Sequence, residues 1–153
     1  GQPAMPDTAK KYHPDDPMKC WELRRLCCID DTPTNTESFF IGKTLRWLKQ
    51  NTDAEVIISY SDLHQGHEGT IYKASNFINL GQSPASKVLM VDGKEFHGRS
   101  MNNKHRPYGR ALKRRWEAKK AGAKDDGIFY AERKPKNIYV YYLNKKVKKK
   151  MLK

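Results

Sequence analysis

Cysteine is scarce in this sequence, and the three residues present are not spaced as bridges or metal ligands usually are. Cys20, Cys27 and Cys28 make an odd number, and two of them are adjacent. This pattern argues against a disulfide framework and is typical of a protein from a reducing compartment. There is no CxxC pair, which argues against a zinc ribbon.

Long apolar runs are missing as well. No run approaches the roughly 20 residues that a helix needs to cross a bilayer. The first residues mix Pro, Lys and Asp and lack the apolar segment of a signal peptide. We therefore expect no membrane partner.

With 153 residues the chain can bury one good core. We expect one domain over residues 1–144, followed by a mobile basic tail over residues 145–153.

Acidic residues are outnumbered. The sequence has 30 Lys and Arg against 17 Asp and Glu, a net charge of +13. This excess indicates an anionic partner, with nucleic acid ranked ahead of a membrane surface. Residues 99–120 hold nine basic residues and one acid, and residues 145–153 hold six Lys and no acid. A solvated surface is the ordinary explanation, yet the near absence of acids favours phosphate contact. The candidate contacts are Arg106, Arg110, Lys113, Arg114, Lys145, Lys146 and Lys148.

The apolar spacing in the first half predicts a βαβ unit. Residues 19–29 alternate as a strand does, and residues 55–60 contain a β-branched run typical of a buried strand. Between them, residues 34–37 fit a capping box that begins a helix ending near Asn51. Two strands joined through a helix are expected to be parallel. The apolar stripe of this helix contains Ile41, Leu45 and Leu48, with Phe40 and Trp47 alongside.

The remaining segments complete a mixed α/β fold. Residues 1–18 hold four of the eight prolines and are expected to be extended or loop. A short helix is expected near residues 70–78, and a hairpin over residues 88–97 turns at Asp92-Gly93. Pro107 begins a second long helix that ends at Gly122. Strands follow over residues 128–131 and 138–143.

A dense polar stretch, residues 60–81, follows the buried strand and is the first candidate for a functional site. Asp62, His64 and His67 lie within six residues, a spacing compatible with a metal or a proton relay. Three candidate ligands in one loop are weak evidence, and we assign no metal. Tyr72 and Asn76 are four apart and would share one side of the short helix. The alternative is a strand, a loop and a helix whose polar residues are satisfied at the surface.

Three motifs resemble the bacteriophage Mom family of DNA-modification proteins. Trp21-Glu-Leu-Arg-Arg-Leu resembles the family's x-E-L-x-R-L strand. Ile58-Ser-Tyr-Ser-Asp and Gly66-His-x-Gly-x-Ile-Tyr-x-Ala-x-Asn-Phe are similar to its most specific signature, which has Ser-Tyr-Ala-Asp and ends in Trp. Phe96-His-x-Arg-Ser, the basic helix and Tyr139-Val-Tyr resemble its C-terminal half. Together these motifs span most of the chain.

The resemblance implies a mixed sheet flanked by helices, similar to that of GNAT acyltransferases. It implies a transferase that converts adenine in double-stranded phage DNA to its N6-carbamoylmethyl form, which protects the DNA from host restriction in the cytoplasm of the infected bacterium. Asp62 would accept a hydrogen bond from the amine, His67 would take its proton, and Tyr139 or Phe77 would stack on the extruded base. The catalytic residues that the family's motifs imply are Asp62, His67, Tyr72, Asn76, Arg99, Ser100 and Tyr139, with Tyr141 the alternative to Tyr139.

Two departures from the GNAT and Mom patterns bear on cofactors and partners. The turn before the first long helix, residues 31–37, has two acids and a Pro but no Gly. It is a poor phosphate cradle, so acetyl-CoA or a related donor does not follow from the sequence. Family members also carry an N-terminal portion that this chain lacks. We therefore expect either a fragment or an assembly with a separate N-terminal polypeptide, with a homo-oligomer as another possibility.

Two other functions remain open at this point. A non-catalytic basic nucleic-acid-binding protein would have the same charge and the same tail, but it gives no reason for the dense polar stretch. A GNAT-like N-acyltransferase with another acceptor keeps the fold, and the cationic helix counts against it.

Overall fold

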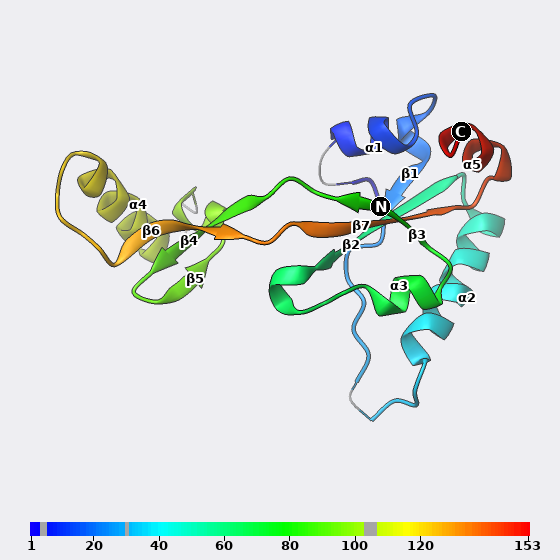
Figure 1. The fold of residues 1–153 in the computed structure, drawn as a ribbon, viewed down its shortest axis with the longest axis horizontal. Coiled ribbons are helices and arrows are strands. Elements are labelled where there is room, and N and C mark those ends of the chain that lie inside the picture. Colours follow the sequence, from blue (N-terminus) through cyan, green and yellow to red (C-terminus); the bar gives the residue numbers. More distant parts are fainter. Residues whose placement is uncertain (4–5, 30, 103–106) are drawn as a thin grey trace. The chain divides into compact units, whose positions relative to one another are not determined.

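The computed structural model describes residues 1–3, 6–29, 31–102 and 107–153. The chain divides into two compact units. Unit 1 contains residues 1–83 and 136–153, and unit 2 contains residues 84–135 (Figure 1). The single domain expected for residues 1–144 is thus built as two units.

Unit 1 is organised around a four-stranded sheet in the order β1-β2-β7-β3. The bounds are β1 Cys20–Glu22, β2 Val56–Asp62, β7 Lys136–Tyr142 and β3 Ile78–Gln82. Strands β1 and β2 are parallel, as predicted, and β7 runs antiparallel to both of its neighbours. The mixed α/β class is therefore confirmed, whereas the likeness to GNAT acyltransferases stays a prediction. Strand β3 was not predicted, because its apolar residues also fit a continued helix.

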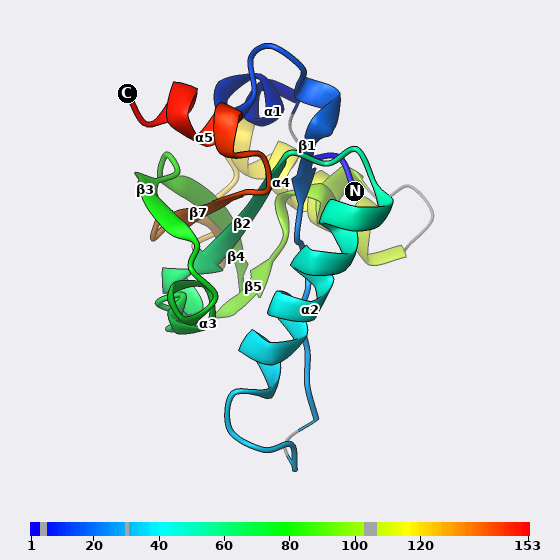
Figure 2. The same cartoon turned by 90° about the vertical axis from the view of Figure 1, so that its right-hand side faces the viewer.

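Helices cover both faces of this sheet, since its strands are apolar on both sides. Helices α1 (Pro6–Tyr12) and α5 (Lys145–Met151) pack on one face, and α2 (Thr36–Asn51) and α3 (Thr70–Ala74) pack on the other (Figure 2). Short 3-10 turns, η1 (Pro17–Lys19) and η2 (Leu63–Gln65), precede β1 and follow β2. The result is a sheet between two helical layers.

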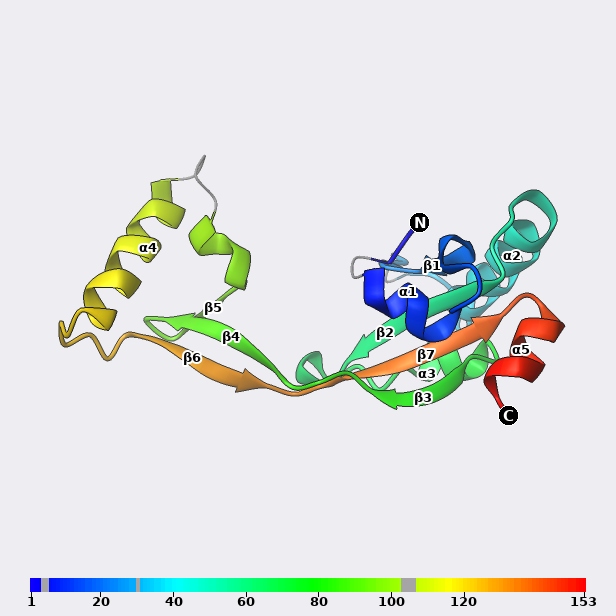
Figure 3. The same cartoon turned by 90° about the horizontal axis from the view of Figure 1, so that it is seen from above.

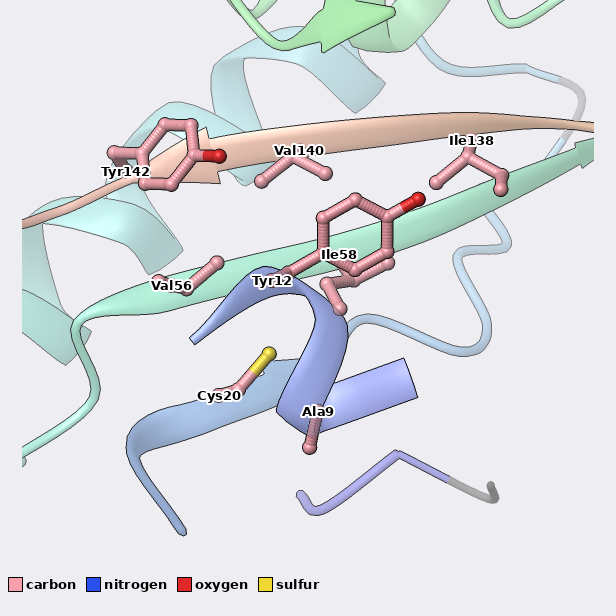
Figure 4. Packing of buried hydrophobic residues seen from close by; sticks show 8 residues of the cluster. All are labelled: Ala9, Tyr12, Cys20, Val56, Ile58, Ile138, Val140 and Tyr142. Carbon is pink, nitrogen blue, oxygen red and sulfur yellow. The ribbon is translucent and has the colours of Figure 1, made fainter. Parts of the chain in front are cut away.

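The core on the α1 face explains why the N-terminal segment is helical and not extended, as had been expected. Ala9 and Tyr12 of α1 bury against Cys20, Val56 and Ile58 (Figure 4). A seven-residue helix is marginal by itself, so this burial stabilises it. His13, at the end of α1, pairs with Glu55 through Nε2 and Oε2, 2.8 Å apart. That hydrogen bond holds the pKa of Glu55 below its ordinary value.

Three hydroxyl or thiol groups in this core are kept out of acid–base chemistry by burial. Burial raises the pKa of Cys20 to about 12, so its thiol stays protonated at neutral pH. The pKa values of Tyr12 and Tyr142 are also raised by burial. Both tyrosine hydroxyls are buried and have no hydrogen-bond partner within the described residues.

The first long helix differs from the prediction at its start and on its surface. Its N-cap is Asn35, with a left-handed φ of 71° and no side-chain capping bond, so the predicted capping box over residues 34–37 is wrong. The end at Asn51 is confirmed. Ile41 and Leu45 are buried as predicted, but Phe40 and Trp47 are 54% and 57% exposed. The buried stripe of this helix is therefore narrower than its apolar composition indicates.

The strand predicted over residues 19–29 is shorter than predicted, since β1 ends at Glu22.

The basic tail is a helix, so the prediction of a mobile arm over residues 145–153 is wrong. The Asn144 side chain caps α5 by accepting a hydrogen bond from the Lys146 backbone N–H at 2.8 Å. Val147 and Met151, four residues apart on one face, pack against the α1-side core. Lys150 donates to both Asp15 carboxylate oxygens, at 2.8 and 2.6 Å.

Unit 2 has its own sheet and core. Strands β4 (Ser86–Val91), β5 (Lys94–Phe96) and β6 (Ile128–Arg133) pair antiparallel in the order β5-β4-β6, and α4 (Pro107–Lys120) covers one face (Figure 3). The predicted hairpin is confirmed, with positive φ values of 49° at Asp92 and 79° at Gly93. The start of α4 at Pro107 is confirmed, and its end lies before Gly122, where φ is 102°. The core contains Leu89, Val91, Leu112 and Ile128.

Candidate functional site

The polar stretch lies where β2 ends in unit 1. Two glycines, Gly66 and Gly69, have φ values of 75° and 79° and let the chain turn from η2 into α3. Within this turn, the His67 backbone N–H donates to the Asp62 carbonyl oxygen at 3.0 Å. The predicted pair Asp62 and His67 is thus held together by the backbone.

Asp62 is the last residue of β2 and is partly covered, its side chain being 19% exposed. Its Oδ1 accepts a hydrogen bond from the His64 backbone N–H at 3.1 Å, which caps η2. The Lys136 ammonium lies 3.6 Å from Oδ2. A carboxylate accepts hydrogen bonds, so Asp62 is a suitable partner for a ligand amine. His67 itself is exposed.

Tyr139 lies on β7 and is fully buried. Its hydroxyl donates to the Glu68 carbonyl oxygen at 2.7 Å, and its ring lies against Gly69, where an added Cβ would overlap it. The ring centroids of Tyr72 and Tyr139 are 5.3 Å apart, and Phe77 packs on Tyr72 at 5.6 Å. These rings form the core beneath α3. With Tyr139 and Phe77 0% and 6% exposed, the expectation that either one stacks on an extruded base does not fit this structure.

Strand alternation separates the predicted residues. Asp62 pairs with Lys136 across β2 and β7, whereas Tyr139 pairs with Ser59. Because Asp62 and Ser59 are three residues apart in one strand, their side chains point to opposite faces of the sheet. Asp62 therefore belongs to the α1 face and Tyr139 to the α3 face. A backbone hydrogen bond joins His67 to Asp62, and the rings of Tyr72 and Tyr139 pack together, but the four side chains do not share one face of the sheet.

The predicted helical pairing of Tyr72 with Asn76 is wrong. Helix α3 ends at Ala74, and Asn76 follows in a left-handed turn with φ of 61°. Tyr72 is buried, whereas Asn76 is exposed and its amide is accessible to a ligand. Tyr141, the alternative to Tyr139, is half-buried and packs on Phe77 with ring centroids 5.3 Å apart.

Two further predicted residues belong to unit 2. Arg99 and Ser100 lie in a 3-10 turn, η3 (Gly98–Asn102), where the Ser100 backbone N–H donates to the His97 carbonyl oxygen at 2.7 Å. Arg106 falls outside the described residues. The other candidate DNA contacts, Arg110, Lys113 and Arg114 on α4 and Lys145, Lys146 and Lys148 on α5, are exposed.

Sequence reasoning missed two serines on the α3 face of β2. The Ser59 hydroxyl donates to the Leu23 carbonyl oxygen at 2.8 Å and marks the point where the chain leaves β1. The Ser61 hydroxyl is buried and has no hydrogen-bond partner in the described part of the chain. Strand alternation puts both serines on one face of β2, but the register of β2 against β7 is needed to show that Tyr139 lies on the same face. Ser61 stands where the resembled family signature has Ala.

A pocket of about 190 Å³ lies between α2 and the first two strands. Trp21, Phe40 and Leu48 are among its apolar lining residues, and Glu22 and Thr44 are among its polar ones. This lining suits an apolar group better than acid–base chemistry. Among residues 1–3, 6–29, 31–102 and 107–153, no group of three or more His, Cys, Asp or Glu side chains is placed to hold a metal ion. Nor do these residues form a helix long and apolar enough to cross a membrane.

The sheet, its two helical layers and the polar loop after β2 define a mixed α/β protein with a candidate site at the end of its central strand. The sequence matches the Mom protein family over residues 1–153, and the chain belongs to this family. The resemblance found in the sequence motifs is thereby confirmed. The chain is also similar to the protein named methylcarbamoylase mom of Escherichia phage Mu, with 29% identity over 139 residues. The match covers 85% of this chain and 51% of that relative, so the chain spans about half the relative's length.

Proposed function

We propose that this chain modifies DNA, transferring a carbamoylmethyl group to the N6 amine of adenine in phage DNA and so protecting it from host restriction. The observation that carries the proposal is the match to the Mom protein family over the whole chain. The name of the phage Mu relative, a methylcarbamoylase, supports the reaction type. Double-stranded DNA is the proposed partner.

The distribution of charge supports a DNA substrate. Unit 2 holds 14 Lys and Arg against six acids, a net charge of +8. Residues 145–153 add six Lys and no acid, while the remaining 92 residues have ten basic residues and 11 acids. The part that carries Asp62 and His67 is therefore close to neutral, and the positive charge is concentrated in unit 2 and in residues 145–153. Lysines and arginines concentrated in this way suit contacts with DNA phosphates.

Asp62 and His67 are the proposed acid–base pair. Adenine N6 is a weak nucleophile, so its amine has to be oriented and deprotonated as the new bond forms. The Asp62 carboxylate accepts one N–H of the amine, and the exposed His67 imidazole takes the other proton. The N6–carbon bond forms as the leaving group departs from the donor's methylene carbon with its electron pair. The exposed Asn76 side chain holds the donor's amide.

Tyr72 and Tyr139 have a positioning role in this proposal. Their buried rings support the turn that carries His67, and the Tyr139 hydroxyl anchors that turn through the Glu68 carbonyl. Substitutions here are expected to act through the position of His67. They do not remove a group that touches the base.

Mass spectrometry of nucleosides tests the function. Plasmid DNA is recovered from bacteria that express the chain, with Asp62→Asn as the control. Asn keeps the Oδ1 that accepts from His64 and removes the charge, so the variant is expected to fold. A deoxyadenosine species heavier by one carbamoylmethyl group, and absent with Asp62→Asn, supports the proposal. Equal modification by both proteins contradicts the role of Asp62.

A basic DNA-binding protein without chemistry is the second candidate. It is favoured by the separation of Asp62 and Tyr139 on opposite faces of the sheet. Unmodified adenine, together with salt-dependent DNA binding by the purified chain, would decide for this candidate.

A further inference from the structure

Helix α4 uses two of its cations to attach itself to unit 2. The Arg115 guanidinium donates to both Asp92 oxygens, at 2.6 and 2.8 Å, and also bonds the Asp125 carboxylate. The Lys119 ammonium donates to the carbonyl oxygens of Asp125 and Ile128, each at 2.7 Å. On the same side of the helix, Leu112 is buried in the core of unit 2 and Trp116 packs against that core. The helix is therefore held rigidly, and these two cations are not available to a ligand.

The opposite side of α4 has an ordered arrangement. At about 100° per residue, Arg110, Arg114 and Glu117 project within a sector of about 60°. Lys113 and Lys120 flank this line on one side, and two small residues, Ala111 and Ala118, flank it on the other. All seven residues are exposed. Long hydrogen-bonding side chains thus form the centre of the stripe and lysines form one margin.

Glu117 lies between the exposed cations of α4, and an acid there does not suit a helix that binds only phosphates. The Glu117 side chain is 61% exposed, and its pair with Lys113, at 3.8 Å between two exposed groups, contributes little to folding. A carboxylate facing phosphates is repelled, whereas in the major groove it accepts a hydrogen bond from the cytosine N4 amine. Arginine matches guanine O6 and N7 through two parallel hydrogen bonds, while lysine binds phosphate as a point charge.

We propose that α4 enters the major groove of duplex DNA and reads base edges through Arg110, Arg114 and Glu117, with Lys113 and Lys120 on the phosphates of one strand. The alanine margin lets the helix approach the other wall of the groove. The helix has 14 residues and a length of about 21 Å, sufficient to present this stripe to several consecutive base pairs. The inference rests on the proposed function for its partner, DNA, and adds a sequence preference located in unit 2.

The test selects duplexes from a randomised pool with the full chain and then measures binding to the preferred duplex and to a scrambled one. Arg114→Lys keeps the charge but removes the two-pronged hydrogen bonding. It is expected to reduce the discrimination between the duplexes by about 5- to 150-fold and to leave the salt dependence unchanged. Glu117→Gln is expected to reduce discrimination while tightening binding to the scrambled duplex.

Lys113→Gln is the matched control on the same helix. Losing one phosphate contact weakens binding to both duplexes equally and lowers the log–log salt slope by about 0.9. All three side chains are exposed, and thermal unfolding checks that each variant folds as the parent does. A parent chain without sequence preference, or a preference that survives both Arg114→Lys and Glu117→Gln, overturns the inference.

Two further outcomes separate this inference from the proposed function. Adenine modification in plasmid DNA by a chain that binds duplexes without preference would overturn the reading helix and leave the function standing. A chain that binds no duplex of any sequence would overturn both.

Discussion

The hydroxyl of Tyr139 donates a hydrogen bond to the backbone carbonyl of Glu68 at 2.7 Å. This bond joins a buried residue of β7 to the turn between η2 and α3, whose start is held by the His67 backbone bond to Asp62. The turn is thus fastened at two points, one on each of the central strands. Its two glycines let it pass close over the sheet.

Tyr139→Phe is expected to loosen this turn while keeping the aromatic packing on Tyr72. The loss of this partly buried hydrogen bond costs about 1 kcal/mol of unfolding free energy, because the Glu68 carbonyl loses its partner. Amide exchange of the turn residues, measured beside thermal unfolding, checks the expectation. Faster exchange confined to the turn agrees with it, and unchanged exchange at His67 and Glu68 would argue that the bond does not anchor the turn.

Gly69→Ala is expected to destabilise the protein more than Gly66→Ala. Both glycines have positive φ, so each alanine costs about 1–2 kcal/mol for its backbone conformation. A Cβ at Gly69 also meets the Tyr139 ring, whereas a Cβ at Gly66 meets nothing within 4 Å. The difference between the two unfolding free energies therefore measures the contact with Tyr139. Equal losses would show that the ring moves aside freely.

Unit 2 is expected to lose stability in acid through Arg115. Its hydrogen bonds lower the pKa values of Asp92 and Asp125 below their ordinary value of 3.8. Carboxyls with lowered pKa values stabilise the folded state above that value, and the stabilisation is lost as pH falls through the lowered values. Arg115→Met should therefore unfold at lower temperature at neutral pH, and its melting temperature should fall less than that of the parent below about pH 4.

Thermal unfolding across that pH range provides the measurement, with Lys113→Gln as the control. Lys113 is also a cation of α4, but its partner Glu117 is exposed, and the control should follow the parent in acid. If the melting temperatures of the parent and Arg115→Met fell by the same amount in acid, the two carboxylates would not gain stability from Arg115.

Neutralising the exposed lysines of α5 is expected to weaken DNA binding without unfolding the helix. In Lys145→Gln/Lys146→Gln/Lys148→Gln, each lost phosphate contact lowers the log–log salt slope by about 0.9. Val147→Ala is the complementary change. It removes packing against the core and should lower the unfolding temperature while leaving the salt slope as it is. If the triple variant kept the parent's slope, α5 would not contact DNA. Deleting the tail would not separate the two effects, since its helix packs against the core.

Local features of the sequence determined much of the fold. The β-branched run before Asp62, the Asp92-Gly93 turn, the proline start of α4 and the helix end at Asn51 each act through neighbouring residues, and the structure has all four where they were predicted. The family is also decided at this level, because the motif residues are consecutive. Of the candidate site, the sequence located the polar turn after β2, where a backbone hydrogen bond joins His67 to Asp62, while the roles of both side chains stay a prediction.

Only the tertiary structure decided which of these residues meet. Whether Tyr139 points into the core or toward a ligand depends on the register of β7 against β2, which pairs residues about 80 positions apart. Helices α1 and α5 are too short to be stable alone, and the packing of Tyr12, Val147 and Met151 in or against the core decides that they form. Which cation of α4 anchors the helix also depends on distant residues. Arg115 is an anchor because Asp92 and Asp125 approach it in the folded unit. Contacts between distant segments leave no pattern in neighbouring residues. Sequence patterns therefore predicted where helices and strands lie along the chain, and only the folded structure shows which side chains are in contact.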